Sequence, residues 1–235
     1  MQLSWLARGR VHLPSGEGWL SEGELRRARG MRFTKRRDEF LIARWTAKQA
    51  IGRICSSGTE PARIEIRHHR SGAPEAYGNG CPLDVSISLT DRADWAVCLL
   101  GPPHVRIGCD LELVEARSTA FVQDYFTGAE RRRIAGDDLA ANLFWSAKES
   151  ALKVLRTGLR RDTRSVEVTV DDPPSGGGWA PLTVRAVEGR VFPGWWIRFG
   201  DFLLTVAADQ ETPHPCSLDE PPALASAVPT HGWLS

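Results

Sequence analysis

Four residues in two short segments have the types and spacing that phosphate chemistry requires. Asp110 and Glu112 are two positions apart where apolar and polar residues alternate, and Glu149 and Lys153 are four positions apart where the periodicity is helical. Alternate residues of a strand share one face, and residues four apart in a helix lie on adjacent turns. Three carboxylates form an oxygen-rich site suited to Mg2+, which takes substrate phosphates and water as further ligands. The four residues therefore predict a metal-assisted phosphate site with a lysine beside it.

A plainer interpretation of the same residues competes with this one. Asp110 and Glu112 are also compatible with ordinary exposed strand positions, and Glu149 with Lys153 is compatible with a helix ion pair worth a few tenths of a kcal/mol. Spacing alone leaves both interpretations open.

The elements that must position these residues follow from hydrophobic periodicity. Between Val105 and Leu113 the apolar residues alternate with polar ones, which predicts a strand with one apolar face and with Asp110 and Glu112 on the other. From Ala141 to Arg156 the apolar residues recur at helical spacing, and Gly158 is placed to end that helix.

A second amphipathic helix is predicted from Phe33 to Ile54. On its polar side, Arg37, Arg44 and Lys48 lie within roughly 40° of one another when projected down the helix axis. This basic stripe is compatible with an ordinary solvated face and with a surface that binds an anion.

The remaining pattern predicts a mixed chain in which strands outnumber helices. Further strands are expected at 85–90, 95–100, 165–170, 182–187, 196–199 and 202–207, with a hairpin through 91–94 and a Pro/Gly loop at 171–178. After residue 208 the periodicity is lost and prolines accumulate, so residues 210–235 are expected to form a flexible tail.

Composition excludes several classes of protein. With 30 basic and 29 acidic residues, the formal charge of +1 provides no overall field that would attract nucleic acid or an anionic membrane. The chain has no apolar run of membrane-spanning length and no signal-like start, so a cytoplasmic location is the default expectation. Reduced and mostly buried thiols are expected for the five cysteines, Cys55, Cys81, Cys98, Cys109 and Cys216, because no partner pattern supports a zinc site or a catalytic cysteine.

The wording of the two acidic segments is more specific than their spacing. Ile107-Gly108-Cys109-Asp110-Leu111-Glu112, followed by Trp145-Ser146-Ala147-Lys148-Glu149-Ser150-Ala151-Leu152-Lys153, resembles the paired signatures of the 4'-phosphopantetheinyl transferase superfamily. Phe33 to Ile51, Gly72-Ala73-Pro74, Ser88-Leu89-Thr90 and Phe126-Thr127 through Glu130 fit the same family, so the resemblance covers roughly residues 30 to 170. The chain length favours the larger, monomeric, two-lobed class over the short trimeric one.

This resemblance implies a fold and a site. The expected fold class is α+β, with two similar lobes in a pseudo-twofold arrangement, each an antiparallel sheet packed with a long helix. The N-terminal lobe would span 1–105 and contact the coenzyme A nucleotide, and the C-terminal lobe would span 106–209 and hold the motifs. The implied site residues are Asp110, Glu112 and Glu149 as ligands of Mg2+ or Mn2+, Glu149 and Lys153 as catalytic residues, and Arg44, Lys48, Thr90, Lys148 and Lys153 as coenzyme A contacts, with Glu130 at an acidic family position of unassigned role.

Two positions depart from the family pattern. Ala73 stands where a basic residue is frequent, and Asp91 stands where many members have a histidine that meets the 3'-phosphate. A carboxylate repels a phosphate. We expect Arg92 to take over this contact while Asp91 turns toward solvent or pairs with a neighbouring arginine.

The resemblance therefore implies an enzyme that transfers 4'-phosphopantetheine from coenzyme A to a serine of an apo acyl or peptidyl carrier protein and releases 3',5'-ADP. The carrier is expected to dock near the second motif on a set of arginines that is equally compatible with plain surface charge: Arg131, Arg132, Arg133, Arg156, Arg160 and Arg161. Two alternatives remain at this point: a catalytically impaired carrier-binding paralogue, suggested by Ala73 and Asp91, and a nucleic-acid-binding module on the basic residues between Arg26 and Arg37.

Overall fold

The computed structural model describes residues 2–54, 59–175 and 177–230. Of Leu159 it describes the backbone only. Cys55 lies outside the described residues. The α-helices in this part are α1 (Glu22–Arg29), α2 (Thr34–Ile54), α3 (Thr119–Tyr125), α4 (Gly128–Ile134) and α5 (Asp138–Leu155). The strands are β1 (Ser4–Gly9), β2 (Ile64–His68), β3 (Pro74–Gly78), β4 (Cys81–Pro82), β5 (Ser86–Arg92), β6 (Trp95–Gly101), β7 (Ile107–Leu113), β8 (Val166–Val170), β9 (Ala180–Ala186), β10 (Val191–Phe199), β11 (Phe202–Ala208) and β12 (Cys216–Ser217). The expected mixture of helices with antiparallel sheets is confirmed.

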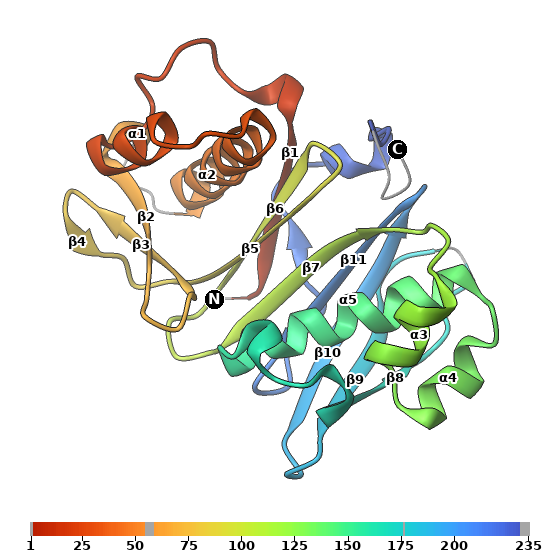
Figure 1. Cartoon of the computed structure of the whole chain (residues 1–235). Coiled ribbons are helices and arrows are strands. Elements are labelled where there is room, and N and C mark those ends of the chain that lie inside the picture. Colours follow the sequence, from red (N-terminus) through yellow and green to blue (C-terminus); the bar gives the residue numbers. More distant parts are fainter. Residues whose placement is uncertain (1, 55–58, 176, 231–235) are drawn as a thin grey trace.

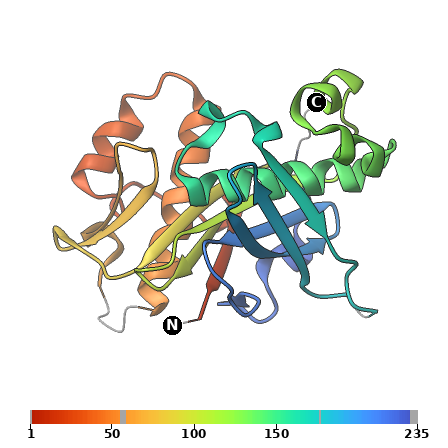
Figure 2. The ribbon, with the colours of Figure 1, turned by 90° about the horizontal axis from the view of Figure 1, so that it is seen from below.

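Two larger sheets each carry one long helix (Figure 1). The N-terminal sheet has the strand order β12-β1-β6-β5, antiparallel except for the β12–β1 pair, and α2 packs on β1 and β6. The C-terminal sheet has the order β7-β11-β10-β9-β8, is antiparallel throughout, and is covered by α5 over β7 and β11. Figure 2 shows the same division from below, with the red-to-yellow elements on one side and the green-to-blue elements on the other.

The two sheets meet along β5 and β7 without a ladder of backbone hydrogen bonds. Instead, the backbone N–H of Cys109 donates to the Ser88 hydroxyl (3.0 Å) and that of Leu111 donates to the Thr90 hydroxyl (3.2 Å). These two hydroxyls satisfy strand donors that would otherwise be buried without a partner. The Ser-Leu-Thr segment therefore joins the sheets and fixes where β7 lies relative to β5.

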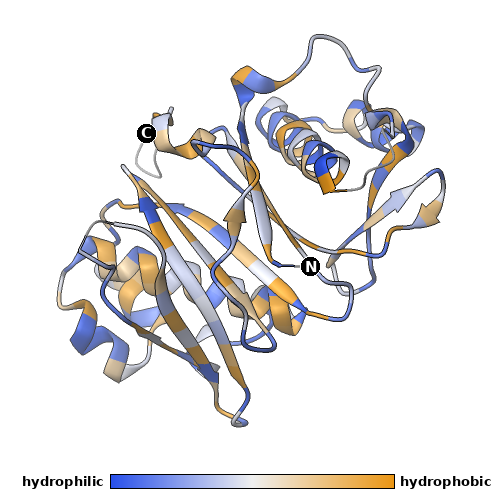
Figure 3. Cartoon of the chain, turned by 180° about the vertical axis from the view of Figure 1, so that it is seen from behind, coloured by the Kyte–Doolittle hydropathy of each residue, from blue (hydrophilic) through white to orange (hydrophobic). Residues whose placement is uncertain are grey.

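One hydrophobic core is shared by both sheets. It gathers buried side chains from β1, β6, β7 and β11, including Trp5, Leu99 and Phe202. Figure 3 shows hydrophobic residues recurring along the strands, whereas the connecting loops are largely hydrophilic. A common core of this kind holds the two sheets in one fixed arrangement.

The predicted helices are confirmed, and the shorter ones were missed. The helix predicted from Phe33 to Ile54 is α2, and the one predicted from Ala141 is α5, which begins three residues earlier. α1 and α4 were not predicted because each has seven or eight residues, although both begin with a capping box, in Ser21–Glu24 and Thr127–Glu130. β10 is longer than predicted since Pro193 and Gly194 lie inside it.

The C-terminal residues lie against the body of the protein. β12 pairs with β1, the Asp219 carboxylate pairs with Arg8 and Arg53, and Leu224 is 1% exposed within the shared core. The flexible tail predicted at 210–235 is therefore a docked segment in its described part. This proline-rich segment forms only short elements, β12 and a 3-10 helix at Ala223–Ser226, but these suffice for strand addition and for burial of single side chains.

No helix among the described residues combines the length and the apolar character needed to cross a membrane.

Candidate functional site

A glycine sets the distance between β7 and α5. A Cβ atom at Gly108 would lie 2.0 Å from the backbone oxygen of Ser150, so no larger residue fits at this position without a shift of the helix. Behind it, the hydroxyls of Ser146 and Ser150 both contact the Thr205 hydroxyl at 2.8 Å. This close packing brings the acidic face of β7 against α5.

Asp110 lies between the two sheets and contacts groups from both sides. Its Oδ1 accepts hydrogen bonds from the Thr90 hydroxyl (3.2 Å) and from Lys153 Nζ (2.9 Å). Lys153 also donates to the Cys109 carbonyl (2.7 Å), so the ammonium is held at the strand by two bonds. Its proximity to Asp110 raises the pKa of Lys153 despite the opposing effect of burial, and the ammonium stays protonated.

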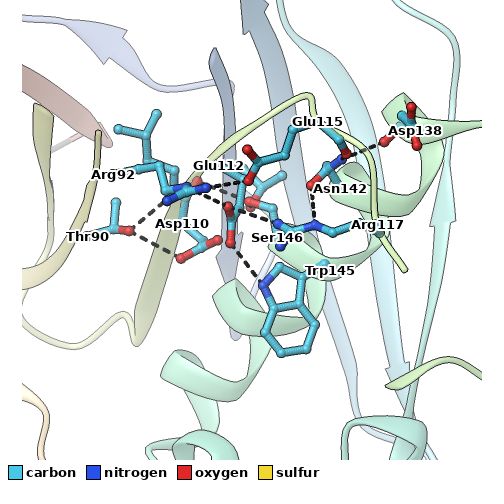
Figure 4. Close-up of polar contacts among 12 residues, drawn as sticks. Thr90, Arg92, Asp110, Glu112, Glu115, Arg117, Asp138, Asn142, Trp145 and Ser146 are labelled. Carbon is cyan, nitrogen blue, oxygen red and sulfur yellow. Dashed lines mark hydrogen bonds and ion pairs between the residues drawn. The ribbon is translucent and has the colours of Figure 1, made fainter. Parts of the chain in front are cut away.

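Glu112 is surrounded by three donors (Figure 4). The Trp145 indole N–H donates to Oε1 at 3.0 Å, while Arg92 and Arg117 approach Oε2 at 3.2 and 3.1 Å. Arg117 is itself held by the Asn142 amide oxygen (2.6 Å), and Arg92 also pairs with Glu115. The prediction that Asp110 and Glu112 share one face of the strand is confirmed, because Asp110 contacts Lys153 and Glu112 contacts Trp145, both on α5.

Two of the three predicted metal ligands keep a buried oxygen that accepts no hydrogen bond, Asp110 Oδ2 and Glu149 Oε1. Glu112, predicted as the third ligand, is already engaged within the protein, because Trp145 contacts its Oε1 and Arg92 and Arg117 contact its Oε2. Burial, with the charge of Asp110 as the next cause, raises the pKa of Glu112 and of Glu149 to about 7. A cluster that resists ionisation in this way gains stability from a bound cation.

Asp110 and Glu149 fit a hard divalent cation such as Mg2+, because each is a carboxylate with an oxygen that accepts no hydrogen bond. In the described residues, however, no three His, Cys, Asp or Glu side chains already converge as a complete ligand set. The carboxylate oxygens suit the cation in chemistry and in charge, and substrate phosphates and water would complete its ligands.

Lys153 connects this acidic cluster to a large cavity. The cavity has a volume of about 810 Å³ and is bounded by α2, the β2–β3 region, β5, the start of β7 and the end of α5. Its basic lining residues are Arg27, Arg36, Arg44 and His68 on the N-terminal side and Arg106, Lys153 and Arg156 on the C-terminal side. Such a lining is suited to a ligand with more than one anionic group.

Arg44 lies in this cavity wall as predicted from the basic stripe, but the other stripe residues do not. Arg44 contacts His68 Nε2 (2.8 Å) and lies over the Phe40 ring, and burial lowers its pKa to about 10. Arg37 instead pairs with Glu17 at 2.6 Å. The basic residues expected on one side of this helix therefore separate, with Arg44 in the cavity wall and Arg37 in an ion pair outside it.

The predicted phosphate contacts from Lys48 and Lys148 do not agree with the structure. Each ammonium is fully buried and pairs at 2.7 Å with a buried carboxylate, Glu24 for Lys48 and Glu130 for Lys148. Lys48 also donates to the carbonyls of Trp19, Pro61 and Ile64, and Lys148 donates to those of Thr163 and Val166. With their donors occupied, both lysines hold helices and strands together and cannot reach a ligand.

Arg92 does not replace the missing histidine. Its guanidinium pairs with Glu112 and Glu115. Thr90, which was also predicted as a coenzyme A contact, instead donates a hydrogen bond to Asp110. Asp91, which alternates with them along β5, lines the cavity with an exposed carboxylate. Within the cavity wall this carboxylate is partly desolvated by the surrounding protein. This desolvation, and next the negative charge of Glu39, raises the pKa of Asp91 to about 6.

The structural roles of Lys48 and Lys148, and the contacts of Arg117 and Asn142, were not predicted from the sequence. For the two lysines, the sequence does contain a signal. The phrase Trp45-Thr46-Ala47-Lys48 recurs as Trp145-Ser146-Ala147-Lys148, and each copy follows a capping box that supplies the buried glutamate. This repetition points to two equivalent structural lysines. Arg117, which contacts Glu112, and Asn142, which accepts a hydrogen bond from Arg117, carry no comparable signal because they come from a loop and from the buried side of α5.

A comparison with known protein families finds a match for the part of the chain that contains the acidic cluster and Lys153. Residues 106–187 match the family model of the 4'-phosphopantetheinyl transferase superfamily. The matched stretch runs from β7 through β9 and contains Asp110, Glu112, Glu149 and Lys153. No curated protein matches the chain. The family match supports a 4'-phosphopantetheinyl transferase activity in general terms, with an acyl carrier protein and coenzyme A as the general partners of such enzymes.

Proposed function

We propose that this protein transfers 4'-phosphopantetheine from coenzyme A to a serine of an apo acyl or peptidyl carrier protein and releases 3',5'-ADP. The observation that carries the proposal is the position of Lys153, which bonds to Asp110 in the acidic cluster and also lines the basic cavity. A nucleotide diphosphate placed in the cavity would meet this lysine at the boundary of the carboxylates.

The proposed metal is Mg2+, with Mn2+ as an alternative, held by Asp110 and Glu149 with Glu112 beside them. When bound, the cation would neutralise charge on the diphosphate and polarise its phosphorus. The two buried oxygens that accept no hydrogen bond, Asp110 Oδ2 and Glu149 Oε1, support this assignment.

The remaining steps belong to the protein's own residues. The serine oxygen forms a bond to the β-phosphorus of coenzyme A as the bond from that phosphorus to the bridging oxygen breaks. Glu149 receives the serine proton, since its buried Oε1 accepts no hydrogen bond within the protein and is available as a base. Lys153 stays protonated and stabilises the charge that develops on the departing 3',5'-ADP.

We further propose that the chain belongs to the larger, monomeric two-lobed class and that its lobes are repeats with a pseudo-twofold relation. The matching Lys48–Glu24 and Lys148–Glu130 pairs support a repeat: each glutamate also accepts a strand N–H, from Ile66 and from Val168 respectively. The proposed lobes are residues 1–105 and 106–209.

Intact-mass measurement of an apo carrier protein tests the function. Incubation with the enzyme, coenzyme A and Mg2+ should increase the carrier mass by about 340 Da, the mass of the phosphopantetheine arm. A carrier that binds the enzyme but keeps its mass would indicate the alternative of an impaired carrier-binding paralogue.

A further inference from the structure

α5 ends at a residue whose backbone conformation normally belongs to glycine. Arg156 has φ 58° and ψ 28°, in the left-handed region, and its N–H bonds to the carbonyls of Leu152 and Lys153. The next N–H, of Thr157, bonds to Leu152 at 3.2 Å, which completes a glycine-type helix C-terminus. A residue with a Cβ is strained there by roughly 1–2 kcal/mol relative to its right-handed conformation.

Arg156 borders the cavity that would receive the ligand. It is exposed, lines the cavity three residues after Lys153, and shares that wall with Arg106. Within the described residues, neither Arg156 nor Arg106 forms a side-chain ion pair with an acidic group. At the end of α5 the cavity is thus bordered by a cation that pairs with no carboxylate of the described residues.

We propose that Arg156 is a phosphate-binding residue that holds the diphosphate of coenzyme A together with Lys153. The assignment rests on the proposed function. It replaces the docking role expected for Arg156 from the sequence, and it supplies a cation that Lys48, Lys148 and Arg92 cannot supply because each is engaged within the protein.

Three variants separate binding from folding. Arg156→Gly removes the guanidinium and the strain, Arg156→Lys keeps the charge, and Ala135→Gly is the matched control. Ala135 ends α4 with φ 43°, is exposed, and is not among the cavity residues. Thermal unfolding should show a higher Tm, by about 2–4 °C, for both glycine variants.

Calorimetric binding of coenzyme A in the presence of Mg2+ should then distinguish them. Arg156→Gly should bind about 10- to 100-fold more weakly than the unaltered protein, Arg156→Lys should recover part of the loss, and Ala135→Gly should bind normally. The same loss is expected with 3'-dephospho-coenzyme A, because both ligands carry the diphosphate. A loss confined to coenzyme A would overturn the assignment to the diphosphate in favour of the 3'-phosphate.

Inorganic pyrophosphate makes the two proposals distinguishable. If Arg156→Gly weakens pyrophosphate binding while no carrier gains mass, Arg156 remains a phosphate-binding residue and the transferase proposal fails. If the unaltered protein modifies the carrier and Arg156→Gly binds coenzyme A equally well, the role of Arg156 is refuted and the transferase proposal stands. A lower Tm for Arg156→Gly with unchanged binding would give the residue a structural role only.

Discussion

Individual oxygens in the acidic cluster have different partners, and this difference assigns their roles. Glu112 is held by Trp145, Arg92 and Arg117, whereas Glu149 Oε1 and Asp110 Oδ2 accept no hydrogen bond. A carboxylate with fixed partners keeps its position, and one with an unused oxygen is available for a cation or a proton. Glu112 therefore orders the site, while Asp110 and Glu149 face its chemistry.

Binding of Mg2+ should depend on pH in a direction set by these carboxylates. The pKa values of Glu112 and Glu149 are raised to about 7, so both are largely protonated at pH 6 and largely ionised at pH 8. Since the cation requires the ionised forms, its affinity should rise about tenfold or more between pH 6 and pH 8, with release of protons. Calorimetry in buffers of different ionisation enthalpy measures both quantities. Glu149→Gln should release fewer protons, and an affinity independent of pH in the unaltered protein would contradict the assignment.

The residue types of the site were predictable from the sequence, and their environments were not. Asp110, Glu112, Glu149 and Lys153 could be placed by periods of two and 3.6 because their own elements determine which way they face. Lys48 and Lys148 have the same periodicity as a ligand-binding lysine, yet each forms an ion pair with a buried glutamate from another helix. Arg92 is similarly occupied by Glu115, from a loop 23 residues away in the sequence. Contacts of this kind depend on tertiary structure.

At the level of elements, the junction of β7 and α5 determines the geometry of the site. Gly108 permits the helix to approach the strand, and Ser146 and Ser150 bond to Thr205 behind it. A change at Gly108 would move Glu149 and Lys153 together, because both belong to α5.

Gly108→Ala should destabilise the protein by about 3 kcal/mol or more, because the added Cβ meets a backbone oxygen that cannot move alone. Denaturant unfolding provides the measurement. The matched control is Gly52→Ala in α2, where a Cβ meets nothing within 4 Å, so this variant should gain about 0.5–1 kcal/mol from helix propensity. Equal stability of the two alanine variants would show that the close approach is not required.

The long elements were predictable and the short ones were not. α2 and α5 have enough turns to show an apolar face, whereas the seven residues of α3 or α4 do not. The strand expected at 196–199 misses the start of β10, which contains Pro193 and Gly194, two residue types that usually interrupt strands. In the structure, Gly194 is needed within the strand, since a Cβ there would lie 2.0 Å from the Val206 carbonyl oxygen.

At the scale of the whole molecule, the C-terminal segment adds to the core shared by the two sheets. Leu224 lies in that core with residues of β1 and β11, and Asp219 joins Arg8 of β1 to Arg53 of α2. The segment thus stabilises the arrangement in which the cavity and the acidic cluster are adjacent.

Leu224→Ala should lower the free energy of unfolding by about 2–5 kcal/mol, as for other buried leucines. Val228→Ala, at a side chain that is 76% exposed, should change it by less than about 0.5 kcal/mol. Chemical denaturation of both variants checks this. If the two changes are equally small, the segment is the flexible tail that its composition suggested.

The central claim is that the acidic cluster and the cavity form one site for phosphopantetheine transfer. The most direct test is to measure, in one reaction with coenzyme A, Mg2+ and an apo carrier protein, both the carrier mass and the 3',5'-ADP released. We predict one 3',5'-ADP for each gain of about 340 Da, and loss of both signals in Asp110→Asn. Release of 3',5'-ADP without a mass gain, or an unchanged rate in Asp110→Asn, would contradict the claim.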